Sequence, residues 1–148
     1  MRKPHHTAID ISSSVRRLSV SRVRIREAAL AVLRAEKVRD AMISVTFLGR
    51  AAMSNLNKRY LGHMGATDVI SFGFGKLGPR DAVIGDIYIC PEIARANAIR
   101  AGIAPGEELL RLVVHGTLHV LGHEHPEKGD RSRSAMWRRQ ERILANVL

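Results

Sequence analysis

The pattern of apolar and polar positions divides the first two thirds of the chain into short segments of different type. Residues 6–14 alternate apolar and polar side chains, which predicts an opening strand. Three further apolar segments have the length and composition of strands: 42–49, 67–74 and 82–90. Between them, residues 21–37 and 50–60 predict helices. Gly85 interrupts the last strand and indicates either a bulge or a close approach of another backbone.

The last third of the chain is predicted to be helical. Proline is favoured at the first position of a helix, and two helices are expected to open in this way, at Pro91 and Pro105. Glu107 and Glu108 lie in the first turn of the second helix, where negative charge suits the helix dipole. From Leu109 to Leu121 this helix is apolar on nearly every side, which predicts a buried central helix ending at Gly122. A final helix covers about residues 131–146. Its inward side chains are expected to be Met136, Trp137, Ile143 and Leu144.

These segments mix strands and helices without a strict alternation, so the chain is expected to adopt an α+β fold. The expected architecture is a small mixed β-sheet of about four strands packed with about five helices. One of these helices is the central buried helix, which is expected to carry metal ligands. A length of 148 residues suits a single domain, residues 1–148.

Charge is the feature of the composition that adds most to this picture. Lys and Arg number 24 against 14 Asp and Glu, a formal net charge of +10. Such an excess favours a polyanionic partner, because each neutralised phosphate releases counterions. A basic surface on a protein without such a partner is the alternative. Aromatic residues make up 4% of the chain, so little base stacking and a weak sequence preference are expected.

The cysteine content and the apolar runs indicate the compartment. Cys90 is the single cysteine, so an intramolecular disulfide is excluded and a reducing environment is favoured. The first ten residues contain no apolar core of signal-peptide length. Residues 28–33 form the longest apolar run of the first half and are too short to span a bilayer. The protein is therefore expected to be soluble and cytoplasmic, without a membrane partner.

Four of the seven histidines fall within residues 115–125. His115 and His119 are four apart on the predicted central helix, so their side chains lie on one face. Gly122 ends that helix and allows the chain to return with His125. Three histidines at these offsets match a zinc site that leaves a fourth position open for water. The other interpretation is a set of buried, hydrogen-bonded core histidines, which suits one histidine better than three at matched spacing.

Two residues between these ligands are candidates for supporting roles. His123 lies two residues before His125 and competes with it as third ligand, but the spacing favours His125. His123 is therefore expected beside the metal or facing the substrate. Glu124 is expected to act on the bound water or to hydrogen-bond a ligand; a solvated surface glutamate is the alternative. Zinc peptidases place a glutamate directly after the first histidine, and here that position is Gly116, which argues against peptide hydrolysis.

The segment HGTLHVLGHEH resembles the H-G-x-L-H-L-x-G-[YF]-D-H signature of the YbeY-type bacterial endoribonucleases, the rRNA maturation factors. Upstream, LNKRYLGHMGATDVISF is similar to the L-N-x-x-Y-R-x-x-D-x-P-T-D-V-L-S-F segment of that family, and IGDIYIC to its L-G-D-I-x-I strand. Met136 and Glu141 stand where the family's last helix carries the same residue types. The resemblance covers about residues 43–145.

This resemblance implies a metal-dependent, single-strand-specific endoribonuclease. It implies a role in maturation of the 16S rRNA 3′ end and in ribosome quality control, with RNA and the ribosome or its proteins as partners. It assigns one Zn²⁺ ion to His115, His119 and His125. It also implies that Gly116 is the family's own residue and that the metal lies at the mouth of a basic cleft in a small α+β domain.

The chain departs from the family at positions that bear on catalysis. The family's catalytic arginine falls on Leu61 here, and Arg59, two residues earlier, is the candidate to supply that charge. His123 and Glu124 replace an aromatic residue and an aspartate, and they join Arg59 as candidate catalytic residues. Leu61 also favours an alternative, a ribosome-associated RNA-binding protein with a mainly structural metal. A small zinc hydrolase or peptidase is the third hypothesis.

Overall fold

The computed structural model describes residues 6–75, 82–124 and 134–148. Within these ranges the chain forms four strands and five helices, which confirms the expected α+β fold with a mixed sheet. The strands are β1 (Thr7–Ser13), β2 (Ala41–Phe47), β3 (Val69–Gly73) and β4 (Val83–Ile89). The helices are α1 (Arg22–Ala35), α2 (Arg50–Leu61), α3 (Pro91–Ala101), α4 (Pro105–Val120) and α5 (Ala135–Ala145).

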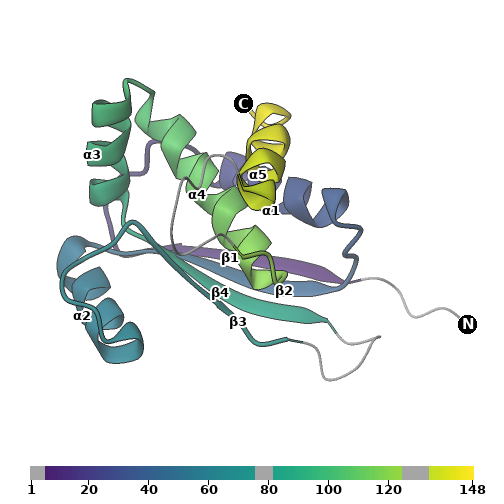
Figure 1. Ribbon diagram of the computed structural model, residues 1–148, viewed down its shortest axis with the longest axis horizontal. Helices are drawn as coiled ribbons and strands as arrows, with labels where there is room; N and C mark the ends of the chain where they lie inside the picture. Colours follow the sequence, from purple (N-terminus) through teal and green to yellow (C-terminus); the bar gives the residue numbers. More distant parts are fainter. Residues whose placement is uncertain (1–5, 76–81, 125–133) are drawn as a thin grey trace, which may run out of the picture.

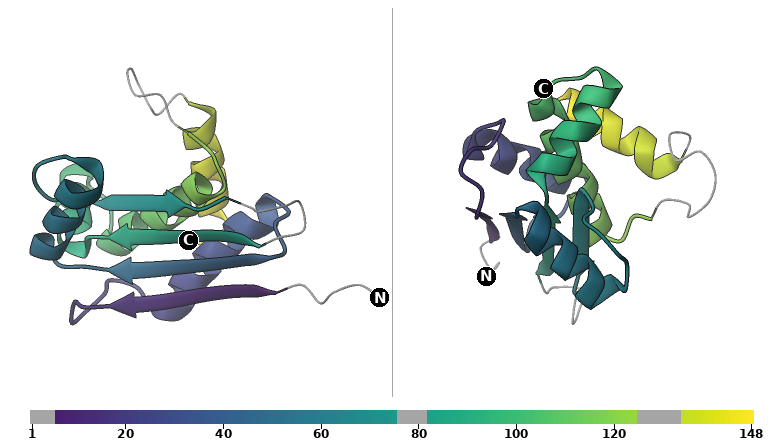
Figure 2. Two further views of the ribbon diagram at one scale, coloured as in Figure 1. Left: turned by 90° about the horizontal axis from the view of Figure 1, so that it is seen from below. Right: turned by 90° about the vertical axis from the view of Figure 1, so that its left-hand side faces the viewer.

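The described strands form one sheet in the order β1-β2-β4-β3. Strands β1, β2 and β4 run parallel, and β3 is antiparallel to β4 at the edge, as the left view of Figure 2 shows. Every second residue of β2 from Ala41 to Phe47 is buried, because successive side chains point to opposite faces of a sheet. Gly85 keeps the register between β2 and β4 unbroken, so it marks a close approach and not a bulge. A Cβ built there would lie 2.3 Å from Val120 Cγ1.

Helices α1, α3, α4 and α5 lie on one side of the sheet, and α2 lies on the other (Figure 1). Helix α4 is the centre of the helical layer, since it contacts α1, α3 and α5 as well as strands β3 and β4. Most of its residues between Leu109 and Val120 are buried, which confirms the buried central helix. The hydrophobic core runs from Ile9 in β1 to Leu144 in α5, so the helical layer and the sheet share one interior.

Capping side chains and prolines fix where the helices begin. Ser21 precedes α1 and Ser134 precedes α5; each hydroxyl accepts a hydrogen bond from the backbone N–H three residues later, at 3.2 and 3.1 Å. Pro91 and Pro105 open α3 and α4, as predicted. Residues 131–133 of the predicted last helix lie outside the described residues, and α5 itself begins after its serine cap.

Helix α4 ends in a left-handed glycine turn, as its sequence predicts. Gly122 has a φ of +98°. Its N–H donates to the carbonyl of His119 at 2.9 Å, and the N–H of His123 donates to the carbonyl of Leu118 at 3.0 Å. This pair of bonds is typical of helices that end in glycine. The turn reverses the chain, so that His123 and Glu124 return towards the last turn of the helix.

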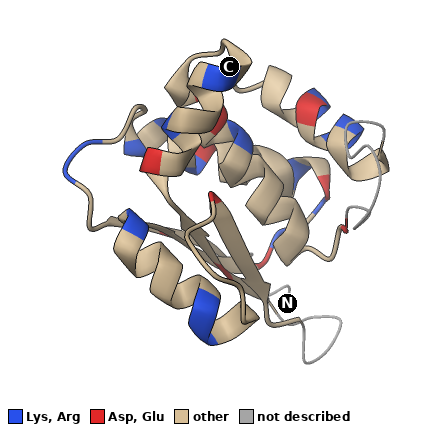
Figure 3. Ribbon diagram, turned by 60° about the vertical axis from the view of Figure 1, so that its left-hand side comes forward, with Lys and Arg blue, Asp and Glu red and all other residues tan. Residues whose placement is uncertain are grey.

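Among the described residues, the lysines and arginines lie on the helices and loops. None of the four described strands contains a lysine or an arginine, and Figure 3 shows the basic positions on the helices and on the loop after β1. The described strands therefore contribute no positive charge, and the charged residues that they do contain are the carboxylates Asp10 and Asp86. Among the described helices, none combines the length and the apolar composition needed to cross a membrane.

Candidate metal centre and active-site cavity

A cavity of about 770 Å³ lies between α4, α5, the edge strand β3 and the turn that follows α4. Its volume is typical of small-molecule sites in proteins. Its polar lining includes Asp68, Ser71, Glu108, Arg111, His115, His119, His123, Glu124 and Gln140. The structure thus brings four of the six predicted site residues to one cavity, namely His115, His119, His123 and Glu124.

His115 and His119 lie one turn apart on the face of α4 that borders this cavity. Their ring centroids are 4.6 Å apart and the ring planes make an angle of 77°. Both rings are half-buried, with the cavity in front of them. The i, i+4 spacing therefore does place two imidazoles side by side, which is the arrangement that a shared metal ion requires.

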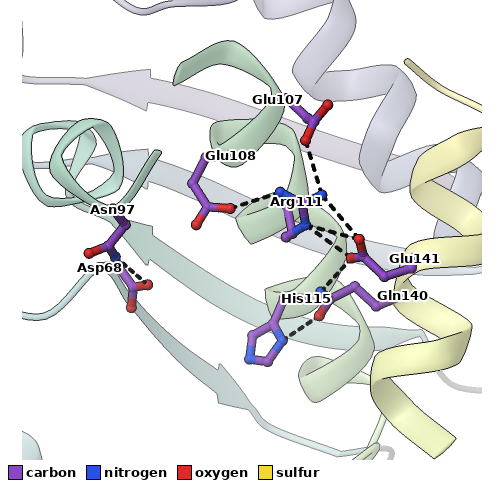
Figure 4. Close-up of polar contacts among 8 residues, drawn as sticks. All are labelled: Asp68, Asn97, Glu107, Glu108, Arg111, His115, Gln140 and Glu141. Atoms are coloured by element: carbon purple, nitrogen blue, oxygen red, sulfur yellow. Dashed lines mark hydrogen bonds and ion pairs between the residues drawn. The ribbon is translucent and has the colours of Figure 1, made fainter. Parts of the chain in front are cut away.

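A buried glutamine fixes the orientation of the first imidazole (Figure 4). His115 Nδ1 lies 2.6 Å from Oε1 of Gln140, whose residue is 1% exposed. The amide nitrogen of Gln140 donates to Glu141 Oε2 at 3.0 Å, so its oxygen is the atom that faces the ring. An amide oxygen only accepts, and His115 Nδ1 must therefore carry the hydrogen. This leaves Nε2 as the ring nitrogen with a lone pair, and an acceptor behind the far nitrogen is usual for histidines that bind metals.

An arginine surrounded by three carboxylates lies next to Gln140 and holds Glu141, the residue to which the Gln140 amide donates (Figure 4). Arg111 donates to Glu107 and Glu108 at 3.1 Å each and to both oxygens of Glu141 at 3.0 Å. Its side chain is 15% exposed. Burial alone lowers the pKa of Arg111, but the hydrogen bonds to Glu141 and Glu108 outweigh this effect and raise it. All three nitrogens of the guanidinium thus donate hydrogen bonds to neighbouring carboxylates.

His123 is held by contacts that reach across to two other helices. Its Nε2 contacts Oε1 of Glu36, at the end of α1, and the other oxygen of Glu36 accepts from Arg139 of α5. Glu36 is 12% exposed, so this bridge is largely shielded from solvent. Through Glu36, the turn after α4 is therefore connected to both α1 and α5. Glu124, the next residue, is exposed and borders the cavity.

The remaining predicted site residues stay predictions. His125 lies outside the described residues. Arg59 is exposed on α2, with its guanidinium carbon 5.6 Å from the centre of the Tyr60 ring. Arg59 is not among the described residues that line the cavity, whereas Leu61 is. Among the described residues no group of three or more potential ligands gathers around one point, so the third ligand of the metal is not shown.

Gly116 has a steric reason to lack a side chain. It faces the sheet, and a Cβ built on it would lie 2.7 Å from Ile87 Cγ2 and 3.1 Å from Ser71 Oγ. A glutamate at this position would collide with β3 and β4 before it could reach the cavity. The position that supplies the general base of zinc peptidases is therefore closed in this fold.

The comparisons with known proteins agree with the resemblance seen in the motifs. Residues 10–148 match the family model described as Endoribonuclease YbeY. Proteins named Endoribonuclease YbeY from Micrococcus luteus, Beutenbergia cavernae and Frankia alni are 37%, 40% and 38% identical to the chain. The alignments cover 73%, 74% and 86% of this chain, and 71%, 76% and 75% of those relatives.

The fold also has a solved counterpart. The solution structure of a protein from Thermotoga maritima superimposes with a TM-score of 0.63 at 23% sequence identity. The match covers 94% of this chain and 88% of that protein. At this level of identity the likeness concerns the fold alone, and it supports the arrangement of helices and sheet described above.

Proposed function

The chain belongs to the Endoribonuclease YbeY family, and on this premise we propose that it is a metal-dependent, single-strand-specific endoribonuclease of rRNA maturation. As a member of this family the protein is an enzyme that cleaves RNA. We further propose that it acts in the cytoplasm on the 3′ end of 16S rRNA and in ribosome quality control. The observation that carries the proposal is the pair His115 and His119, side by side on the wall of a cavity.

The proposed metal site consists of His115, His119 and His125 with one Zn²⁺ ion. The first two residues fit a metal, since their rings adjoin and Gln140 fixes the orientation of His115 through Nδ1. The glycine turn at Gly122 sends the chain back towards them, which supports His125 as the third ligand. A zinc ion held by these residues would supply a Lewis acid for a phosphate oxygen and would lower the pKa of a coordinated water to about 7.

The chain's own residues supply the other functions that the reaction needs. Glu124 is exposed at the cavity, and its carboxylate is the proposed acceptor for the proton of the attacking water. His123 has its Nε2 occupied by Glu36, so its proposed role is to position the turn that carries Glu124. Lys58 and Arg59 lie exposed at the end of α2, next to Leu61 on the cavity wall, and are proposed to bind the RNA backbone.

One observation favours the second candidate function, an RNA-binding protein with a mainly structural metal. Leu61, where the family carries its arginine, lines the cavity, and Arg59 does not. The two functions are separated by incubating the purified, zinc-loaded protein with single-stranded RNA. If the protein is an endoribonuclease, the RNA is cut, cleavage stops when a chelator is added, and cleavage resumes when zinc is restored. Salt-dependent binding of the RNA without cleavage would support the second function. Chelator-sensitive peptide hydrolysis would support the third hypothesis, a zinc peptidase.

Replacing Gln140 by leucine is expected to weaken zinc binding about 10- to 100-fold, because His115 loses the acceptor that orients its ring. The measurement is a competitive zinc titration, with the folded state checked by circular dichroism. Gln140→Glu restores an oxygen opposite Nδ1 and is expected to recover most of the affinity. Equal affinity for zinc in the Gln140→Leu and wild-type proteins would show that this contact does not position the ligand.

A further inference from the structure

The described lining of the cavity beside the histidines holds more carboxylates than cations, although the chain as a whole is strongly basic. Its described lining contains three carboxylates, those of Asp68, Glu108 and Glu124, and a single cation, Arg111. Arg111 is shared among Glu107, Glu108 and Glu141, two of which lie outside the lining. The positive charge of Arg111 is therefore more than compensated by its own neighbours.

This charge distribution determines which part of an RNA strand the cavity accepts. Away from the proposed zinc site, a phosphate inside the cavity would face carboxylates without an uncompensated cation among the described lining residues, which costs free energy in a partly dehydrated space. Exposed basic residues, Lys58 and Arg59, stand instead at the end of α2 near Leu61. The backbone of a bound strand is thus favoured at the mouth, and the uncharged base is the part that fits inside.

The walls suit a flat, partly apolar group. Trp137 is half-buried and lines the cavity, together with Leu61, Ile103, Leu112 and Met136. An indole ring offers a surface on which a base can stack. The volume of about 770 Å³ leaves room for one nucleotide next to the two histidines.

Asp68, which also lines the cavity, supplies a hydrogen-bond acceptor. Its backbone is fixed, because its carbonyl accepts from the N–H of Cys90 at 2.9 Å. Among the described residues, its side-chain oxygens receive only long contacts, from Thr67 Oγ1 and from Asn97 Nδ2, each at 3.4 Å; Figure 4 shows the second of them. These lie at the outer limit of hydrogen bonding, so the carboxylate retains capacity for a stronger donor. Burial raises the pKa of Glu108 and the charge of Asp68 adds to that rise, as expected for two carboxylates bordering the same space.

We propose that this cavity is a nucleobase subsite that prefers bases with an exocyclic amino group, with Asp68 accepting a hydrogen bond from that group and Trp137 stacking on the ring. The proposal rests on the endoribonuclease function proposed above, since the base belongs to the nucleotide next to the cleaved phosphate. Cytosine has an amino group where uracil has a carbonyl oxygen, and a carboxylate accepts from the first and is repelled by the second.

The test compares oligocytidylate and oligouridylate of equal length on the zinc-loaded protein. Affinity is measured by stopped-flow fluorescence anisotropy before cleavage proceeds, and the cleavage rate is measured afterwards on the same mixture. The wild-type protein is expected to bind and cut the cytidine oligomer about tenfold better. Asp68→Asn is expected to reduce this preference to within about twofold, because its amide adds a donor where the base also donates.

Two further variants keep the result interpretable. Asp10→Asn makes the same chemical change on the exposed surface of β1 and is expected to leave the preference at the wild-type value. Trp137→Leu is expected to weaken binding of both oligomers about tenfold and to retain the preference. If Asp68→Asn does not fold, the Trp137→Leu variant provides the test in its place. Unchanged binding of both oligomers by Trp137→Leu would then overturn the subsite.

The outcomes separate the subsite from the proposed function. Equal binding of the two oligomers by the wild-type protein, or a tenfold preference that survives Asp68→Asn, would overturn the subsite. A preference in binding that depends on Asp68, with neither oligomer cut, would uphold the subsite and contradict the endoribonuclease proposal. Cleavage of both oligomers at equal rates and with equal affinities would uphold the endoribonuclease proposal and overturn the subsite.

Discussion

Replacing His119 by alanine is expected to reduce cleavage of single-stranded RNA at least about 10³-fold. The variant loses one of three proposed zinc ligands, and with it the activated water and the charge stabilisation that the ion supplies. His119 is half-buried at the cavity edge of α4, and alanine favours the helix, so the fold is expected to persist. The measurement is the initial rate of cleavage of a labelled single-stranded RNA by the zinc-loaded protein.

His6→Ala provides the matched control, because His6 is exposed next to β1 and distant in sequence from the histidine cluster. It is expected to retain the wild-type rate and the wild-type zinc content. The His119→Ala protein should contain little zinc after dialysis while its melting temperature in the presence of chelator matches that of the metal-free wild type. RNA cleavage that survives His119→Ala would mean that the reaction does not use this site.

Replacing Arg111 by methionine is expected to lower the free energy of unfolding by about 3 kcal/mol, the largest stability effect predicted for this chain. The substitution leaves Glu107, Glu108 and Glu141 close together without their shared cation. Because a carboxylate without a partner is costly in a partly buried place, removing one member of the cluster costs more than the ion pairs themselves contribute. The measurement is urea unfolding followed by circular dichroism.

Arg34→Met is the matched control for this prediction. Arg34 is 72% exposed and its nitrogen lies 3.9 Å from Glu27, the geometry of a weak surface ion pair. Its replacement is expected to change stability by less than about 1 kcal/mol. If Arg111→Met were no more destabilising than Arg34→Met, the carboxylate cluster would be a solvated surface feature and not a support for α4 and α5.

The described helices and strands could be predicted from the sequence because their signals are local. Alternation in β2, the prolines that open α3 and α4, and the glycine that ends α4 each act over a few residues. The pairing of His115 with His119 is local in the same sense, since a four-residue spacing on a helix fixes it.

The supports of the site could not be predicted in this way because they join distant segments. Gln140 reaches His115 across 25 residues, and Glu36 reaches His123 across 87. Nothing in the immediate sequence of Glu36 distinguishes it from any other glutamate at a helix end. The Arg111 cluster had a partial signal, because Glu107 and Glu108 precede it by four and three residues, a spacing at which helical ion pairs form. That signal predicts the ion pairs but not the third carboxylate, which comes from α5.

The central claim is that three imidazoles, those of His115, His119 and His125, hold one zinc ion and leave a position for water. X-ray absorption spectroscopy at the zinc edge of the purified protein tests it directly. The account predicts one zinc per chain, a first shell of nitrogen and oxygen at about 2.0–2.1 Å, and scattering from three imidazole rings that falls to two in His125→Ala. A sulfur shell at about 2.3 Å, or a spectrum that His125→Ala leaves unchanged, would contradict it.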